Sequence, residues 1–227
     1  MVDGPFRGMR YAFAAQGSYI STKILGTYEK ELHGIVQEIQ RLAPDHIVNI
    51  GAGEGYYAVG LGRGSRRGQR ITCFELDERG RVLLQTIAGW NLVSNLEIKG
   101  RCEIADLKAA VRPSTSGHER IVVICDVEGY ESVLLDPKQV EGLRGGYILV
   151  ETHDDLVHGV TDLLVARFEA THKITHIRAV NRQWEDFPKP NFWASALPRS
   201  LALRAMGEGR RLPQGWIWMT PIPTLLQ

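Results

Sequence analysis

The sequence contains no long apolar run, few cysteines and almost no excess of either charge, and each shortage excludes a class of protein. No apolar stretch approaches the roughly 20 residues that span a bilayer, and residues 1–10 lack the apolar core of a signal peptide. We therefore expect a cytoplasmic protein without a membrane partner. The three cysteines form no C-x-x-C pair, so there is no zinc signature. A net charge of +1 gives no general attraction for nucleic acid, and the expected partner is a small soluble molecule.

An apolar run at residues 46–50 ends in three alternate glycines, Gly51, Gly53 and Gly55, ahead of a helix-compatible stretch. Glycines after a buried strand let the backbone approach a ligand closely, and a helix start directs free N–H groups towards it. This pattern predicts a nucleotide-type cofactor loop, although an ordinary strand-to-helix turn has the same composition. The dinucleotide pattern G-x-G-x-x-G requires a third glycine where this chain has Tyr56. The G-x-G-x-G spacing instead resembles motif I of the class I methyltransferases, which bind S-adenosylmethionine.

Glu75 comes directly after the second apolar run, residues 71–74, and follows Gly51 by about 24 positions. In Rossmann-like folds an acid at this place accepts hydrogen bonds from both ribose hydroxyls of an adenosine. The alternative is that Glu75 favours the dipole of a helix expected at residues 78–90, a role that Asp77 fills equally well. The glycines and the acid together favour a cofactor site.

Short β-branched runs alternate with helical patterns, which predicts an α/β fold with a parallel sheet and ligands at the carboxyl ends of its strands. The expected strands are residues 46–50, 71–74, 96–99, 121–125, 147–150, 173–180 and 215–219. The expected helices are residues 27–43, 56–61, 78–90, 104–111 and 156–168, the first capped by Thr27. This order of elements resembles the class I methyltransferases, and the resemblance implies a Rossmann-like, seven-stranded, mostly parallel sheet. It also implies helices on both faces of the sheet and an antiparallel last strand beside the sixth.

The length of 227 residues and the hydrophobic content of 44% fit one domain. Within it we expect an irregular N-terminal arm and a helix at residues 1–43, and a cofactor-binding core at residues 44–180. A lid or substrate insertion follows at residues 181–214, and the last strand and tail occupy residues 215–227.

Residues 181–214 form a connection long enough to be functional or disordered rather than a simple loop. Its aromatic residues are Trp184, Phe187, Phe192 and Trp193. They favour an aromatic lid or substrate wall. The alternative is a surface excursion packed on itself or on a neighbouring subunit of a homo-oligomer.

Two further strand ends carry acids. Asp126-Val-Glu-Gly-Tyr-Glu131 follows the apolar run at residues 121–125 and resembles the D-x-E-G-x-E signature of the FkbM-type methyltransferases. Val150-Glu-Thr-His153 is similar to that family's next strand, and Gly26-Thr-Tyr-Glu29 to a segment ahead of its glycine loop. The resemblance covers residues 26–168, and nothing after residue 180 matches.

The FkbM-type family mostly methylates hydroxyl groups with S-adenosylmethionine, so the resemblance implies O-methylation of a small molecule such as a sugar or natural product. It implies a cofactor pocket with Asp126 near the methyl-bearing end and with Tyr28 and Glu29 over it. The predicted cofactor-binding residues are Tyr28, Gly51, Ala52, Gly53, Gly55, Glu75, Leu76, Cys102 and Asp126. Two alternatives stay open: an NAD-type oxidoreductase, which Tyr56 opposes, and a binding module without catalysis.

Methyl transfer to a hydroxyl requires alignment and removal of a proton. The candidate catalytic residues are His153, Glu128 and Glu151. His153 is favoured as the base because imidazole titrates near neutrality and nearby acids can orient it, although it can equally cap the next helix. A divalent metal on Asp126, Glu128, Glu151 and His153 is the less favoured mechanism. Catechol-type O-methyltransferases hold magnesium at similar strand ends, but they use an Asp-Asn pair where this chain has Glu151-Thr152.

Overall fold

The computed structural model describes residues 1–15, 18–112, 119–188, 198–209 and 215–223. Over these residues the chain forms one seven-stranded sheet in the order β3-β2-β1-β4-β5-β7-β6. The strands are β1 His46–Ile50, β2 Arg70–Phe74, β3 Leu96–Lys99, β4 Ile121–Cys125, β5 Tyr147–Thr152, β6 His172–Arg178 and β7 Gly215–Pro221. Strand β7 runs antiparallel between β5 and β6, while the pairs from β3 to β5 are parallel. The expected Rossmann-like sheet with an antiparallel last strand is confirmed.

Eight α-helices and three short 3₁₀ turns complete the described part of the chain. The helices are α1 Ile20–Leu25, α2 His33–Leu42, α3 Tyr56–Gly62, α4 Glu78–Trp90, α5 Ile104–Ala110, α6 Glu131–Leu134, α7 Val160–Phe168 and α8 Arg199–Met206. The 3₁₀ turns are η1 Lys30–Leu32, η2 Glu141–Gly145 and η3 Trp184–Asp186. No helix in the described ranges combines the length and the apolar character that crossing a membrane requires.

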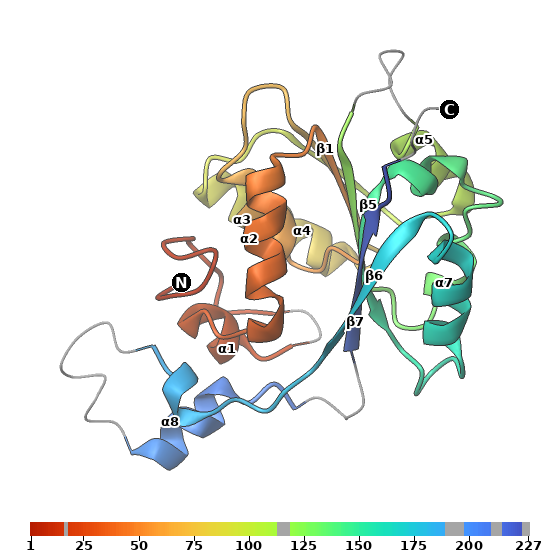
Figure 1. Cartoon of the computed structure of the whole chain (residues 1–227). Coiled ribbons are helices and arrows are strands. Elements are labelled where there is room, and N and C mark those ends of the chain that lie inside the picture. The colour runs from red at the N-terminus through yellow and green to blue at the C-terminus, as the bar shows by residue number, and fades with distance from the viewer. Residues whose placement is uncertain (16–17, 113–118, 189–197, 210–214, 224–227) are drawn as a thin grey trace.

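Alternation along the central strands divides the core into two layers, one on each face of the sheet. On β4, Val122 and Ile124 pack with α2, α3 and α4, whereas Val123 and Cys125 pack with α5, α6 and α7. Figure 1 shows these two groups of helices on opposite sides of the sheet. Because both faces are covered, all five residues of β4 are buried, which agrees with the continuous apolar run of this strand.

The order of the strands reverses at β1, whose parallel neighbours are β2 on one side and β4 on the other. Connections leave β1 and β4 towards opposite sides of the sheet. A crevice therefore opens between their carboxyl ends, the usual ligand position in this architecture. The glycine loop and the acids of the 126–131 segment lie at these two ends.

Two expected helix starts were wrong. Thr27 is not a cap: Gly26 ends α1 with φ +82° and Glu29 turns again with φ +46°, so α2 begins only at His33. The arm that we expected to be irregular thus contains a helix. Residues 156–159 are not helical either, because Gly159 takes φ +76° immediately before α7.

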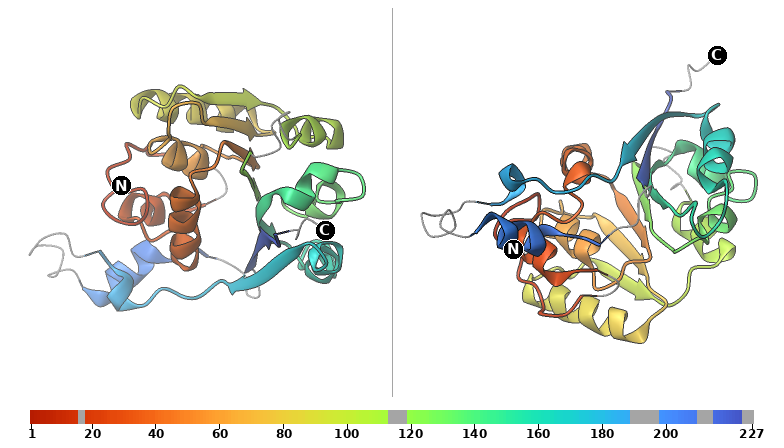
Figure 2. Two further views of the ribbon diagram at one scale, coloured as in Figure 1. Left: turned by 45° about the horizontal axis from the view of Figure 1, so that its top comes forward. Right: turned by 90° about the horizontal axis from the view of Figure 1, so that it is seen from below.

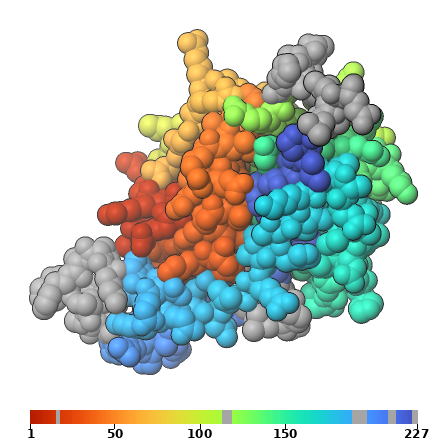
Figure 3. Space-filling view, in the orientation of Figure 1, coloured from red at the N-terminus to blue at the C-terminus, as the bar shows by residue number. Residues whose placement is uncertain are grey.

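The segment after β6 packs against the N-terminal part of the chain. Phe187, Ala202 and Met206 form a small apolar cluster with Leu25 of α1, and Trp184 stacks on Phe187 at a centroid distance of 6.0 Å. Figure 2 shows α8 beside the N-terminal helices, and Figure 3 shows the light-blue residues after β6 against the N-terminal part of the chain. Phe192 and Trp193 lie outside the described residues.

Arg182 fastens this segment by bridging two acids, all three side chains being buried. Its guanidinium contacts Glu31 and, at 3.0 Å, Glu208. Glu208 also accepts a hydrogen bond from the Glu29 N–H at 3.1 Å. The described residues of the predicted lid therefore brace the N-terminal wall of the molecule.

Candidate functional site

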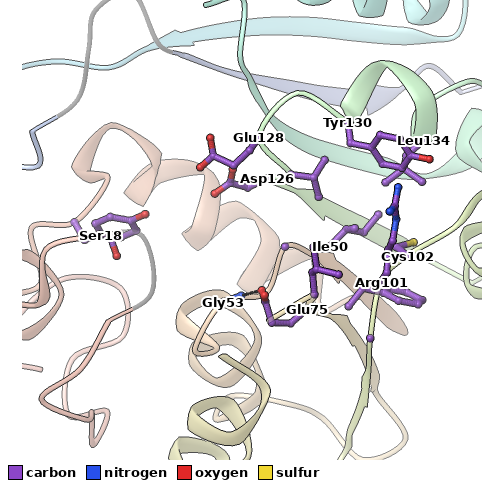
Figure 4. Close-up of a pocket in the computed structure, with 16 residues that line it drawn as sticks. Ser18, Ile50, Gly53, Glu75, Arg101, Cys102, Asp126, Glu128, Tyr130 and Leu134 are labelled. Atoms are coloured by element: carbon purple, nitrogen blue, oxygen red, sulfur yellow. Dashed lines mark hydrogen bonds between the residues drawn. The ribbon is translucent and has the colours of Figure 1, made fainter. Parts of the chain in front are cut away.

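A cavity of about 550 Å³ lies at the carboxyl ends of β1, β2 and β4. Figure 4 shows Arg101 at one end of it and Ser18 at the other. Glu75, Asp126 and Glu128 lie between them. The cavity thus joins three of the four strand ends at which the sequence places polar clusters.

Gly51 and Gly53 form the floor of this cavity. Gly51 has φ +73°, and a Cβ atom there would lie 1.6 Å from the Asp126 carbonyl oxygen. Only glycine allows the first loop to pass so close to the end of β4. The close approach keeps the crevice narrow and the loop backbone accessible to a ligand.

Glu75 is held in place by two backbone N–H groups. Its Oε2 accepts from Gly53 at 2.7 Å and its Oε1 accepts from Asp77 at 2.8 Å. Gly80 of α4 makes room for the side chain, because a Cβ atom at Gly80 would lie 2.9 Å from the Glu75 Cγ. A carboxylate oxygen has more than one acceptor site, so both oxygens can still accept from ligand hydroxyls.

Not every predicted cofactor residue lines the cavity. Gly55 has φ +93° and faces α4, where a Cβ atom would lie 2.9 Å from Leu84. Ala52 is buried beneath the loop and donates its N–H to the Phe74 carbonyl at 3.0 Å. Both residues support the loop from behind. Glu29 is also buried, and its carboxylate accepts from the Tyr57 hydroxyl rather than reaching over the cavity.

Leu76, Cys102 and Tyr28 do line the cavity, as predicted. Burial raises the pKa of the Cys102 thiol to about 12, so this residue offers a neutral wall and no nucleophile. Arg101 and Tyr130, which were not predicted from the sequence, also line the cavity. The Arg101 guanidinium lies 5.0 Å from the centre of the Tyr130 ring. Arg101 and Tyr130 close the end of the cavity next to Cys102.

His153 follows β5, is only 2% exposed and does not itself line the cavity. Its Nδ1 lies 2.5 Å from Oε1 of Glu131. Its Nε2 lies 3.5 Å from Glu128 and 3.7 Å from Asp126, both of which line the cavity. The ring therefore spans the space between a buried acid behind it and two cavity acids in front of it.

The pKa of His153 reflects these neighbours. Burial acts to lower the pKa, but the hydrogen bond and charge of Glu131, with the charges of Asp126 and Glu128, outweigh burial and raise the pKa above its ordinary value. The neutral ring is consequently a stronger base than free imidazole. Glu131 is not among the catalytic residues predicted from the sequence. Its one sequence signal is its place as the last acid of the D-x-E-G-x-E signature.

The backbone of Glu128 is in the left-handed region, which residues other than glycine seldom adopt. Its φ is +51° and its side chain is 77% exposed. Strained backbone of this kind is concentrated at functional sites. The turn directs the Glu128 carboxylate at His153.

Glu151 does not join this group. It is a buried β5 residue paired with Trp216 of β7, and it does not line the cavity. Among the described residues, Asp126, Glu128 and His153 offer ligand atoms within 4.8 Å of one another. Two carboxylates and an imidazole suit a divalent cation such as magnesium or manganese, so the donor set fits a metal without Glu151.

No protein-family model matches the chain, and no curated protein is similar to it in sequence. Solved structures are similar in fold. An O-methyltransferase from Bacillus cereus in complex with S-adenosylhomocysteine (SAH) is 15% identical with a TM-score of 0.55, over 96% of this chain and 84% of that one. The O-methyltransferase TomG from Streptomyces achromogenes, in complex with S-adenosylmethionine, is 14% identical with a TM-score of 0.55, over 86% and 80%.

An rRNA methylase from Streptococcus thermophilus has the same TM-score of 0.55 at 13% identity, over 85% of this chain and 96% of that one. The chain therefore has the Rossmann-like methyltransferase fold. Because enzymes with different acceptors share this fold, the acceptor has to be argued from the site itself.

Proposed function

We propose that this protein transfers a methyl group from S-adenosylmethionine to a hydroxyl oxygen of a small molecule. The observation that carries the proposal is the shared cavity. Glu75, fixed by the N–H groups of Gly53 and Asp77, faces the same space as Asp126 and Glu128. An adenosine anchor thus adjoins a set of proton acceptors, as methyl transfer requires.

We infer a place in the cavity for each part of the cofactor. Glu75 accepts the ribose hydroxyls, and Leu76 and Cys102 contact the adenine beside Arg101. The methionine part extends along Gly51 and Gly53 towards the end of the cavity at Ser18 and Tyr28. Two structures of similar fold are complexes with S-adenosylmethionine or SAH, which supports the choice of cofactor.

The acceptor hydroxyl binds beside Asp126 and Glu128. When bound, the cofactor supplies an electrophilic methyl group on sulfur. The cavity acids orient the hydroxyl, and Nε2 of His153 accepts its proton as the new oxygen–carbon bond forms. His153 is the proposed base because Glu131 holds its ring through Nδ1 at 2.5 Å, which leaves Nε2 towards the two cavity acids.

Two observations support a small hydroxyl acceptor. The cavity of about 550 Å³ is of the size of ordinary small-molecule sites, and the net charge of +1 gives no attraction for RNA. The D-x-E-G-x-E resemblance to FkbM-type methyltransferases also supports a hydroxyl. An NAD-type oxidoreductase is not favoured, since Tyr56 replaces the third glycine of the dinucleotide pattern.

Variants at Glu75 test the proposal. Glu75→Ala removes the acceptor for two ribose hydroxyls, a loss of about 1.5–3 kcal/mol for charge-assisted bonds, so the calorimetric Kd for SAH should rise tenfold or more. Glu75→Gln keeps one acceptor oxygen and should lose less. Glu78→Ala, which removes an exposed acid from the first turn of α4, is the matched control and should bind normally. Undiminished affinity in folded Glu75→Ala would contradict the proposal.

A further inference from the structure

Glu131 is a carboxylate with no exposure to solvent, on the first residue of α6. One oxygen meets Nδ1 of His153 at 2.5 Å, and the other has no hydrogen-bond partner among the described residues. Burying a carboxylate costs several kcal/mol unless it is fully paired. An apolar residue would fill the same space at lower cost, so stability does not explain the acid.

The acids around the His153 ring determine which of its two nitrogens carries the proton. A neutral imidazole carries one N–H, on either Nδ1 or Nε2. Asp126 and Glu128, which lie 3.7 Å and 3.5 Å from Nε2, favour an N–H on Nε2. That tautomer would turn the lone pair towards the protein interior, where it is useless as a base. Glu131, acting at the shorter distance of 2.5 Å, favours the N–H on Nδ1.

We propose that Glu131 is a positioning residue that fixes the Nδ1–H tautomer of His153 and so keeps the lone pair of Nε2 facing the cavity acids Asp126 and Glu128. The inference rests on the proposed function, in which Nε2 accepts the proton of the acceptor hydroxyl. Like His153, Glu131 does not line the cavity. Its effect is confined to the ring that it orients, in the manner of a carboxylate behind a catalytic histidine.

The tautomer can be measured directly. In ¹⁵N-labelled wild-type protein, long-range ¹H–¹⁵N spectra at a pH where the ring is neutral should show a protonated Nδ1 and a bare Nε2 for His153. His153→Gln assigns the signals. A ring with its N–H on Nε2 would overturn the inference without any variant at Glu131.

The Glu131→Gln variant then tests the cause. The amide preserves the size of the side chain but removes the charge that opposes Asp126 and Glu128, and its NH2 group can donate to a bare Nδ1, so the ring should change to the Nε2–H tautomer. Glu141→Gln, which removes the same charge at an exposed position, should leave the tautomer unchanged. Glu131→Asp, one methylene shorter, serves if the Gln variant does not fold. An unchanged tautomer in the folded variant would overturn the inference.

SAH binding separates this inference from the proposed function. Glu131→Gln should bind SAH within about twofold of wild type, because the residues assigned to the cofactor are untouched. With an accepted hydroxyl substrate, its kcat should fall by on the order of 10²- to 10⁴-fold while the KM for S-adenosylmethionine stays constant. Wild-type kcat in this variant would overturn the positioning role. Absence of SAH binding in the wild type would instead overturn the proposed function.

Discussion

Replacement of Glu128 by glycine should stabilise the protein and inactivate it at once. A side chain at φ +51° costs about 1–2 kcal/mol, and glycine removes this cost. Glycine also gives the unfolded chain more freedom, which offsets about 0.5–1 kcal/mol. The free energy of unfolding should therefore rise by about 1 kcal/mol. For a chain of this size that corresponds to an increase in Tm of about 2–4 °C.

The same substitution removes the carboxylate that lies 3.5 Å from Nε2 of His153. Methyl transfer, measured as SAH formation with a panel of sugar and natural-product hydroxyls, should fall at least tenfold while the calorimetric Kd for SAH is unchanged. Glu128→Ala separates the two effects, since it loses the carboxylate but retains the backbone strain. It should lose activity without gaining stability.

Leu92 provides the matched control. It has φ +56° and is 91% exposed. It follows α4 by two residues and does not line the cavity. Leu92→Gly should raise the Tm by a similar amount and leave activity unchanged. A Glu128→Gly protein that is less stable than wild type, or equally active, would refute the reasoning that links the strained turn to function.

Three further predictions concern the loop, the metal alternative and pH. Gly51→Ala should weaken SAH binding by more than tenfold, because its Cβ would lie 1.6 Å from the Asp126 carbonyl; Gly89→Ala, with nothing within 4 Å, should bind normally in the same calorimeter. Dialysis against chelator should leave methyl transfer unchanged if His153 is the base, whereas loss of activity and its recovery with magnesium would transfer the task to a cation. Burial, with the charge of Arg70, lowers the pKa of His46 from 6.5 to about 4, so its contribution to stability is complete above pH 6.5 and is lost as the pH falls towards 4. At about 1.4 kcal/mol per pKa unit this amounts to about 3.5 kcal/mol. Urea unfolding of His46→Gln should show a shallower decline over that range, and an equal decline would show that His46 is not responsible.

Local sequence patterns were enough to predict most of the sheet and, in the candidate site, the glycine loop and the acid after the second strand. The strands at residues 46–50 and 121–125 are continuous apolar runs, and a turn rich in glycine followed by an acid on the next strand depends only on neighbouring residues. Gly55 shows the limit of such patterns. It has the same letter and spacing as Gly51 and Gly53, yet it serves the packing of α3 on α4 because the loop has already turned away from the cavity.

What the sequence could not supply depends on contacts between distant residues. The turn at Glu29, which displaced the expected helix start, is held by Glu208 across 179 positions. Glu131 meets His153 only because α6 places the acid behind the turn after β5. Neither contact leaves a periodic signal, so both required the structure.

Calorimetric titration of the wild-type protein with SAH, S-adenosylmethionine and NAD tests the central claim most directly. The site predicts that SAH and S-adenosylmethionine each bind with one-to-one stoichiometry and that NAD gives no binding heat. Binding of NAD without binding of either sulfur cofactor would contradict the account.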